Sequence, residues 1–334
     1  MNARFTFSGA IPANLLPFNE DYSVDEPAYR AHLAWLADVE GVSAIVCNGH
    51  AAEVASLNRE ERRRALAIAL EAVGDRVAVI SGVYTDNTFE AADMAREAAT
   101  EGAAGLLVFP PSFFMWGARL RPEMALAHVG AVAEACDLPL IVFQYPVASG
   151  MGYTPQTLAR LAEIPTVAAV KDWSNDMVAL EANLRALRAV PAAGDTGAVR
   201  KTGGRPVAHL SAYTMSLLGS YLLGSDGSIS GMGSVVADSH AEMFAAVQRG
   251  ELQTAREIND RLAPLVDVFY APPFLDMHNR MKEALAMLGR IPKAVVRPPL
   301  QRVSDAERRS IREALLAAGL LEPGWEAQQR RAAT

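Results

Sequence analysis

Cysteine is scarce in this sequence: its 334 residues include only Cys47 and Cys136. Two cysteines cannot form a disulfide scaffold, and their spacing is not that of a metal site. The sequence also lacks any apolar run approaching the ~18 residues that a membrane-spanning helix requires, and its start shows no apolar segment of the signal-peptide kind. We therefore expect a protein of the reducing cytoplasm that makes no contact with a membrane.

Positive charge is not concentrated anywhere, because the chain has no dense basic block and its net charge is −7. Nucleic acid is therefore not an expected partner. Hydrophobic residues make up 51% of the chain and charged residues 21%, which is ordinary globular composition and excludes disorder as the main state. At ~150 residues per domain the length suggests two domains, although α/β barrels of ~250 residues often form one.

Short apolar runs alternate with amphipathic segments along most of the chain. Each run is continuous rather than alternating in hydrophobicity, which is typical of parallel strands buried on both faces. The predicted strands are residues 8–14, 42–48, 76–82, 105–109, 138–145, 167–171, 207–211 and 227–230. The helices predicted between them include residues 59–73, 88–101, 122–135 and 155–163. Three of these helices follow N-cap residues, namely Asn58, Asn87 and Thr154.

Eight strands that are mostly followed by helices predict a (β/α)8 TIM barrel. The alternative is an open doubly wound sheet, which would need a G-x-G-x-x-G turn, whereas residues 47–53 read CNGHAAE. Further helices are predicted at residues 234–249, 252–269, 277–288 and 304–318. The predicted parts are a barrel at 1–250, a C-terminal helical extension at 251–321, a frayed tail at 322–334, and an exposed loop at 192–206 within the barrel.

Lys171 is the first candidate catalytic residue, because catalytic groups in such barrels lie at the carboxyl ends of the strands. It ends a predicted strand and is followed by Asp172, Trp173 and Ser174. Burial of an ammonium group lowers its pKa and makes the neutral amine available as a nucleophile toward a carbonyl carbon. The alternative is a structural lysine whose charged end reaches the solvated rim of the barrel.

Two further candidates follow strand ends. His50, with an ordinary pKa of about 6.5, suits proton transfer near neutral pH, or it is a hydrogen-bonded residue of the rim. Tyr145 either donates a proton or packs against the residue after it. Glu53 is interpreted as structural, and His240 and His278 as ordinary surface or interface residues. No cluster of His, Cys, Asp or Glu has the spacing of a metal site, so no metal is expected.

Four large apolar residues, Phe113 to Trp116, follow the fourth predicted strand. On a loop they either line a pocket for an apolar part of the substrate or cover a subunit interface. The sequence leaves both interpretations open.

Six motifs in barrel order carry a resemblance to a known family. They are GAIPANLLPF at 9–18, GHAAE at 49–53, SGV at 81–83, LPLIVFQYP at 138–146, VKDWS at 170–174 and GSDGSIS at 224–230. In these motifs the chain resembles the dihydrodipicolinate synthase / N-acetylneuraminate lyase superfamily of Schiff-base aldolases and dehydratases. The resemblance implies a TIM barrel, no cofactor, and Lys171 as the residue that forms the imine. It also implies a homotetramer built as a dimer of dimers.

The chain departs from the family pattern at several positions. Phe143 stands where the family has its catalytic tyrosine, and His50 replaces the first of two threonines. The arginine that distinguishes true dihydrodipicolinate synthases falls at Ala148, and the tyrosine that reaches the partner chain falls near Phe113. We therefore expect the nucleophile to be kept and the proton relay to be rebuilt, with His50 favoured and Tyr145 as the second candidate.

The expected function is that of a lyase acting on a pyruvate-type 2-oxo acid through an imine on Lys171. Aldol cleavage or condensation and a hydratase-aldolase reaction are both open, with an aldehyde as a second substrate, whereas true dihydrodipicolinate synthase activity is not expected. The alternatives are a 2-keto-3-deoxy acid dehydratase or deaminase and a non-catalytic barrel that binds a 2-oxo acid. The backbone N–H groups of the turn at 49–52 are expected to bind the substrate carboxylate. The expected substrate-binding residues are Gly49, Ala51, Ala52, Phe143, Ser230 and Phe113.

Overall fold

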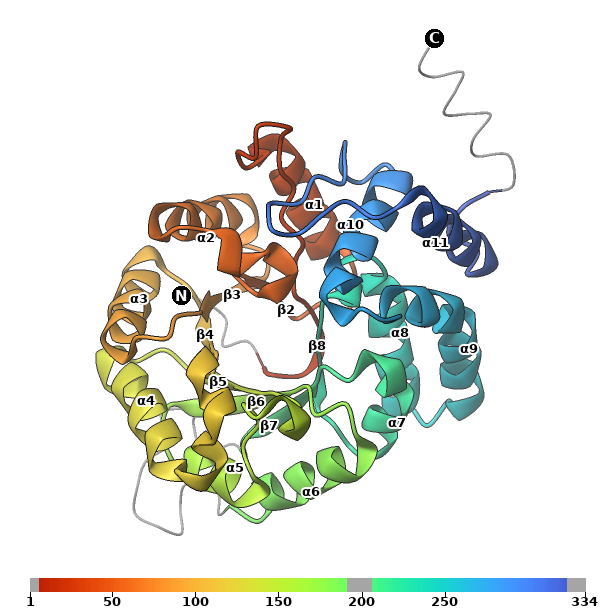
Figure 1. The fold of residues 1–334 in the computed structure, drawn as a ribbon. Coiled ribbons are helices and arrows are strands. Elements are labelled where there is room, and N and C mark those ends of the chain that lie inside the picture. Colours follow the sequence, from red (N-terminus) through yellow and green to blue (C-terminus); the bar gives the residue numbers. More distant parts are fainter. Residues whose placement is uncertain (1–5, 191–205, 323–334) are drawn as a thin grey trace.

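The computed structural model describes residues 6–190 and 206–322 and shows a ring of parallel strands inside a ring of helices (Figure 1). The strands are β1 Gly9–Pro12, β2 Ala44–Cys47, β3 Ala78–Val83, β4 Gly105–Val108, β5 Leu140–Gln144, β6 Val167–Asp172, β7 Ala208–Ser211 and β8 Gly227–Ser230. They pair in the order β1-β8-β7-β6-β5-β4-β3-β2, and bridges from Ala10 to Val42 and from Ala13 to Val46 join the two ends of this order. The predicted TIM barrel is confirmed, and the doubly wound alternative is excluded.

Alternation along the strands divides the apolar residues between two layers. Ile45 and Leu106 belong to the layer between strands and helices, and their neighbours Val46 and Leu107 belong to the layer inside the barrel. All four are fully buried. The predicted strands are apolar without alternation because both of their faces are covered.

Helices cover the outside of the barrel, and side-chain caps fix where several of them begin. Asn58 accepts a hydrogen bond of 2.9 Å from the Glu61 N–H, and the Glu61 carboxylate accepts one from the Asn58 N–H. The side chains of Asn87 and Thr154 cap their helices as the sequence predicts. The helices are α1 Glu26–Asp38, α2 Arg59–Val73, α3 Thr88–Glu101, α4 Pro122–Ala135, α5 Pro155–Ala162, α6 Met177–Arg188, α7 Leu217–Leu222 and α8 Ala237–Gln248.

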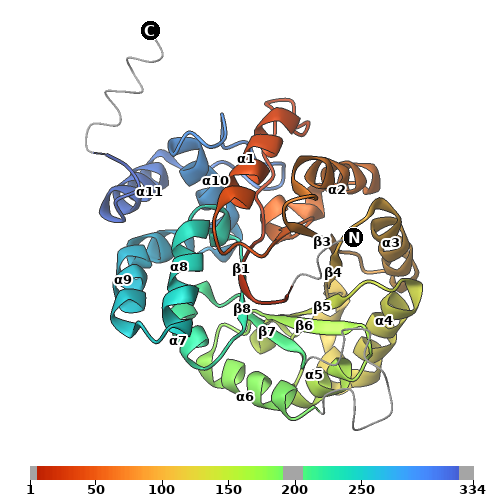
Figure 2. The ribbon, with the colours of Figure 1, turned by 180° about the vertical axis from the view of Figure 1, so that it is seen from behind.

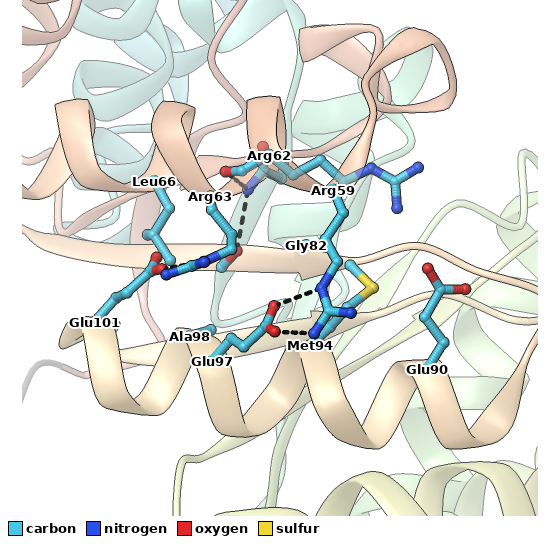
Figure 3. A pocket seen from close by; sticks show the side chains of 12 residues that line it. Arg59, Arg62, Arg63, Leu66, Gly82, Glu90, Met94, Glu97, Ala98 and Glu101 are labelled. Atoms are coloured by element: carbon cyan, nitrogen blue, oxygen red, sulfur yellow. Dashed lines mark hydrogen bonds and ion pairs between the residues drawn. The ribbon is translucent and has the colours of Figure 1, made fainter.

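A pocket on the outside of the barrel lies between α2 and α3 (Figure 3). Arg59 pairs there with Glu97, and Arg63 pairs with Glu101 at 2.8 Å. The charges of these four residues are therefore already matched. Exposed pairs of this kind contribute roughly 0–1 kcal/mol each to stability, so we interpret this pocket as a helix contact rather than a ligand site.

In the described chain α8 is followed by α9 Leu252–Phe269, α10 Met277–Met287 and α11 Asp305–Ala317. Figures 1 and 2 show these helices on one side of the barrel, beside α1 and α8. Met281 and Leu285 of α10 belong to the same buried cluster as Ile229 of β8. The extension thus shares a core with the barrel, and its separation as a domain of residues 251–321 stays a prediction.

Among residues 6–190 and 206–322, no helix is long and apolar enough to cross a lipid bilayer. Two predicted segments lie almost entirely outside the described residues, namely the loop at 192–206 and the tail at 322–334. Only residues 206 and 322 of these segments are described.

Candidate active site

Lys171 lies near the carboxyl end of β6, with its side chain inside the mouth of the barrel. Only 6% of its surface is exposed, and its Nζ lies 4.0 Å from the centre of the Phe143 ring on β5. No carboxylate within the described chain forms an ion pair with it. Burial therefore lowers the pKa of Lys171 to about 7, so much of the amine is uncharged near neutral pH.

Asp172, the next residue, points to the opposite side of β6. Its carboxylate accepts hydrogen bonds from Asn183 at 2.8 Å, from His209 at 3.1 Å and from the Ser174 N–H at 2.8 Å. Burial would raise the pKa of Asp172, but the bonds from His209, Asn183 and Ser174 outweigh burial and lower it. The Asp172 carboxylate thus links the end of β6 to α6 and β7, and it does not pair with Lys171.

His50 and Tyr145 meet at the mouth of the barrel, where His50 Nε2 and the Tyr145 hydroxyl form a hydrogen bond. The His50 ring lies edge-on to Phe109, with centroids 4.9 Å apart, and 6.0 Å from the ring of Phe143. The Tyr145 ring lies 4.6 Å from that of Phe143. The structure thus brings three predicted site residues together beside Lys171, and their roles stay predictions.

The two hydrogen-bonded residues are both uncharged. Burial, followed by the charges of Lys171 and His278, lowers the pKa of His50 to about 3. Burial raises the pKa of Tyr145 well above its usual value. The expectation that His50 titrates near neutral pH is therefore wrong, because that expectation used the pKa of a solvated imidazole. Its place beside Lys171 keeps His50 a candidate for the proton relay.

The turn after β2 carries three of the predicted binding residues, Gly49, Ala51 and Ala52. It forms the short helix η1 (His50–Ala52), and both alanines are buried. Within the described residues, the backbone N–H groups of His50 and Ala51 donate no backbone hydrogen bond. These two donors are therefore free to meet a ligand at the barrel mouth.

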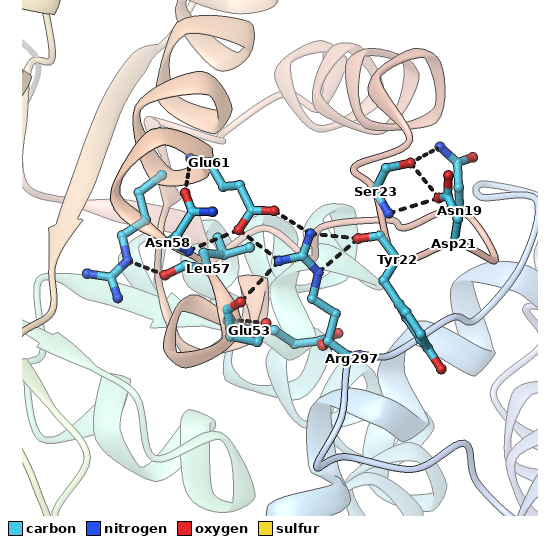
Figure 4. A network of polar contacts seen from close by, with 11 residues as sticks. Asn19, Asp21, Tyr22, Ser23, Glu53, Leu57, Asn58, Glu61 and Arg297 are labelled. Carbon is cyan, nitrogen blue, oxygen red and sulfur yellow. Dashed lines mark hydrogen bonds and ion pairs between the residues drawn. The ribbon is translucent and has the colours of Figure 1, made fainter.

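Glu53 ends this turn in a left-handed conformation, with φ of 54°. Such a backbone is costly for a residue with a side chain and persists only where its surroundings fix it. The carboxylate accepts hydrogen bonds from Lys282 Nζ and, at 2.9 Å, from the Arg297 N–H. Arg297 also pairs with Glu61 and donates to the Tyr22 carbonyl at 2.6 Å (Figure 4). The segment after α8 therefore holds the turn, in agreement with the structural interpretation of Glu53.

The last two predicted binding residues differ in where they lie. Ser230 ends β8 at the barrel mouth, and its buried hydroxyl is hydrogen-bonded to that of Thr214 at 2.9 Å. Phe113 lies on η3 (Ser112–Trp116) and is 37% exposed. Within the described residues no ring contact joins Phe113 to the cluster around Lys171, so one chain alone does not bring it into the site.

Three aromatic residues of this cluster were not singled out as site residues from the sequence. Tyr84, Phe109 and Trp173 directly follow β3, β4 and β6. The Trp173 ring lies 5.6 Å from that of Tyr145. The strand-end rule that identified Lys171 applies equally to these three residues and would have found them.

His278 is the fourth missed residue, and its interpretation as an ordinary surface or interface residue is corrected here. It lies on α10, yet burial and then the charges of Lys171 and Lys282 lower its pKa to about 3. Its own charge also lowers the pKa of His50. No sequence signal marks it, because α10 begins more than forty residues after the last barrel strand.

Comparisons with known proteins agree with this geometry. The model of the dihydrodipicolinate synthetase family matches residues 6–318. A relative from Syntrophus aciditrophicus (strain SB), named 4-hydroxy-tetrahydrodipicolinate synthase, is 31% identical over 94% of this chain and 99% of its own. A dihydrodipicolinate synthase from Acinetobacter baumannii, solved in complex with pyruvate, is 26% identical with a TM-score of 0.81, over 95% of this chain and 100% of that one. A monomeric dihydrodipicolinate synthase variant shares the fold, with a TM-score of 0.84 at 24% identity over 96% and 100% of the two chains.

These relatives overturn one prediction. The sequence-based exclusion of dihydrodipicolinate synthase activity, and with it the preference for other lyase reactions, is wrong, because the full-length relatives are named for that synthase. The exclusion depended on Phe143 and Ala148, which replace a family tyrosine and a family arginine. The prediction of a Schiff-base-forming lyase is confirmed. Among the described residues, no group of three His, Cys, Asp or Glu side chains is arranged to hold a metal ion.

Proposed function

The chain belongs to the dihydrodipicolinate synthetase family, and from this premise we propose that it is a synthase that condenses pyruvate with an amino aldehyde. The observation that carries the proposal is the amine of Lys171, which is buried without a carboxylate partner in the described chain and has a pKa of about 7. An uncharged amine at the mouth of a barrel is the nucleophile that imine chemistry requires. The pyruvate complex of the Acinetobacter relative supports pyruvate as the 2-oxo acid.

The name of the relatives defines the second substrate by its atoms. The product 4-hydroxy-tetrahydrodipicolinate is a nitrogen ring with two carboxylates and seven carbons, of which pyruvate supplies three. The remaining four carbons carry the amine, the second carboxylate and a hydroxyl where an aldehyde stood. The second substrate is therefore a four-carbon 2-amino acid that ends in an aldehyde.

Each step of the proposed reaction balances. The Lys171 amine forms a C–N bond to the 2-oxo carbon of pyruvate and one water leaves, which gives a protonated imine. Carbon 3 then loses a proton, and the enamine forms a C–C bond to the aldehyde carbon while the aldehyde oxygen takes up a proton. The substrate amine finally replaces Lys171 at carbon 2, closing the ring and releasing the lysine. One water leaves overall.

We assign the proton transfers to the hydrogen-bonded pair of His50 and Tyr145, since Phe143 offers no hydroxyl. A neutral imidazole accepts a proton at one nitrogen and carries one at the other, and the phenol of Tyr145 holds its proton firmly. His50 is favoured as the group that exchanges protons with the intermediate, because its uncharged imidazole can both accept and donate a proton, whereas the raised pKa of Tyr145 makes its phenol a poor proton donor. The carboxylate of pyruvate is assigned to the N–H groups of His50 and Ala51, which donate no backbone hydrogen bond within the described residues, in the turn that also carries Gly49 and Ala52.

The experiment incubates the protein with pyruvate and the four-carbon amino aldehyde and follows the product by mass spectrometry. We expect a compound lighter by one water than the sum of the two substrates. In parallel, borohydride with pyruvate alone should attach a reduced pyruvyl group to Lys171, located by a tryptic map. Lys171→Met is the matched control, since it keeps the length of the side chain without the amine.

Two outcomes would contradict the proposal. Labelling of a different lysine would remove Lys171 from the mechanism. Labelling at Lys171 without the condensed product, while another aldehyde reacts, would assign the chain to a different aldehyde substrate.

We also propose that the protein forms the homotetramer expected for its family. Support comes from Met115, Trp116 and Leu120 in the loop after β4, which are 54%, 85% and 85% exposed in the single chain. Because one protein with this fold is described as a monomeric variant, the fold alone does not fix the assembly. Light scattering at micromolar concentration should give four chains, and a monomer would refute this. The cytoplasmic location also remains a proposal, which cell fractionation tests.

A further inference from the structure

His278 reaches the barrel mouth from α10 and lies against the end of β8. A Cβ atom at Gly231 would lie 2.9 Å from His278 Nε2 and 3.5 Å from the Ala51 Cβ. Gly231 directly follows β8, and Ala51 belongs to the turn after β2. The imidazole and the Ala51 side chain therefore both lie against Gly231 at the end of β8, and the turn that carries Ala51 is the one to which we assign the substrate carboxylate.

The close contact between the His278 ring and the end of β8 depends on the absence of a side chain at Gly231. Its backbone is helical, with φ of −64° and ψ of −39°, which any residue adopts. Glycine is thus not required there by conformation. A Cβ atom 2.9 Å from Nε2 and 3.0 Å from Cδ2 of His278 would collide with the ring. The absent side chain leaves room for His278 in its present place.

The imidazole of His278 has no protein partner that explains its position. Within the described residues its nitrogens form no hydrogen bond, whereas the buried His209 bridges Asp172 at 3.1 Å and Ser225 at 3.0 Å. As a residue His278 is only half-buried. His32 is also buried with both ring nitrogens unbonded in the described chain, so the argument for His278 rests on its free nitrogens together with its place against Gly231 and the turn of Ala51.

The groups that interact with His278 are basic. The charges of Lys171 and Lys282 act on it, and it acts in turn on His50. Glu53, the nearby carboxylate, is already bonded to Lys282 and to the Arg297 N–H. The nitrogen donors of this site are unpaired, and its carboxylate already accepts hydrogen bonds from other residues. Such a site favours the binding of an anion.

We propose that His278 is a substrate-binding residue that donates a hydrogen bond to the carboxylate of the 2-oxo acid, together with the N–H groups of His50 and Ala51. The inference rests on the proposed imine at Lys171, because the carboxylate is bonded to the carbon that this lysine attacks. In this chain a side chain of the C-terminal extension therefore selects 2-oxo acids over uncharged ketones.

The test measures borohydride trapping without any aldehyde, at varied concentrations of pyruvate and of its uncharged amide, pyruvamide. Loss of a hydrogen bond to a charged group predicts that His278→Ala raises the half-saturating pyruvate concentration roughly 10–100-fold, with little change for pyruvamide. His278→Asn, which keeps an N–H donor, should recover most of the affinity. Gly231→Ala, which displaces the ring without removing it, should reproduce the effect of His278→Ala.

The possible results separate this inference from the proposed function. Equal weakening for both ligands would show a structural role, and unchanged pyruvate binding in His278→Ala would overturn the inference. Trapping that depends on His278 but is followed by no condensed product would refute the synthase and leave the inference standing. If wild type traps no pyruvate, calorimetric titration with pyruvate decides: binding weakened in His278→Ala supports the inference, and unweakened or absent binding overturns it.

Discussion

Two buried lysines of this chain have opposite surroundings. Lys171 and Lys282 are 6% and 1% exposed, and each ammonium lies over an aromatic ring, at 4.0 Å from Phe143 and at 4.5 Å from Phe18. Burial lowers the pKa of both. Lys282, however, donates to the Glu53 carboxylate and, at 2.9 Å, to the Val295 carbonyl, whereas Lys171 has no carboxylate partner in the described chain.

The difference shows that burial by itself does not make a lysine reactive. The Glu53 charge raises the pKa of Lys282 and opposes the effect of burial, so Lys282 is held as a cation that ties α10 to the turn after β2. Lys171 is buried without that compensation, and its neutral amine is the favoured form at slightly basic pH. One lysine therefore stabilises the site, and the other has the uncharged amine that the proposed reaction requires.

The largest effect is expected from removing the reactive amine. Lys171→Met should lower kcat/KM by roughly 10⁵-fold, the order of loss when an enzyme loses its nucleophile, and should abolish borohydride trapping. The fold should persist, because the change removes a desolvated amine that has no partner carboxylate. Circular dichroism and thermal unfolding provide the control. If the kcat/KM of Lys171→Met stayed within tenfold of wild type, Lys171 would not be the reactive lysine, and its contrast with Lys282 would have no catalytic meaning.

The next effect concerns the pair beside Lys171. His50→Ala should lower kcat by roughly 10²–10⁴-fold, the usual contribution of a general acid–base, while trapping of pyruvate remains possible. Tyr145→Phe should do less, since it keeps the ring and removes only the hydroxyl. Steady-state kinetics of both variants give the comparison. Near-normal turnover in His50→Ala beside an inactive Tyr145→Phe would transfer the role to Tyr145.

The structural lysine should show its effect in stability. Lys282→Met leaves the Glu53 carboxylate buried without its partner, which typically costs about 3–5 kcal/mol in the free energy of unfolding, measured with urea. The double variant Glu53→Gln/Lys282→Met should recover part of this loss, because it removes both charges. If the double variant were as unstable as the sum of the two single changes, Glu53 and Lys282 would not act as a pair.

Much of this comparison could be predicted from the sequence, but not all. Lys171 is found because it ends an apolar strand, and the barrel is found because its eight strands are continuous apolar runs. The contact between Glu53 and Lys282 joins residues 229 positions apart, and local periodicity carries no information on such pairs. His278 was missed for the same reason.

The protonation states of the site residues and the exact reaction also could not be predicted from the sequence. The low pKa of His50 depends on its desolvation and on Lys171, which only the folded chain provides. The exclusion of synthase activity weighed Phe143 and Ala148 against the similarity of the whole chain. Although His50 and Tyr145 were expected to rebuild the proton relay, no replacement was foreseen for the arginine that falls at Ala148.

The smallest effect is a pH dependence that separates the two lysines. With a pKa of about 7, the neutral fraction of Lys171 rises about tenfold between pH 6 and 8, so trapping at low pyruvate should rise with it and then level off. The neutral fraction of an ordinary lysine, and with it the trapping, would rise only toward pH 10.

The lowered pKa of Lys171 also affects stability. Between pH 7 and about 10 the unfolded chain still binds the proton that Lys171 has released in the folded chain. The free energy of unfolding should therefore increase with pH over this range. Lys171→Met should remove this increase, as shown by urea unfolding at pH 7 and 9. Trapping that stays flat to pH 8 and rises above pH 9 would mean that Lys171 is charged like a solvated lysine.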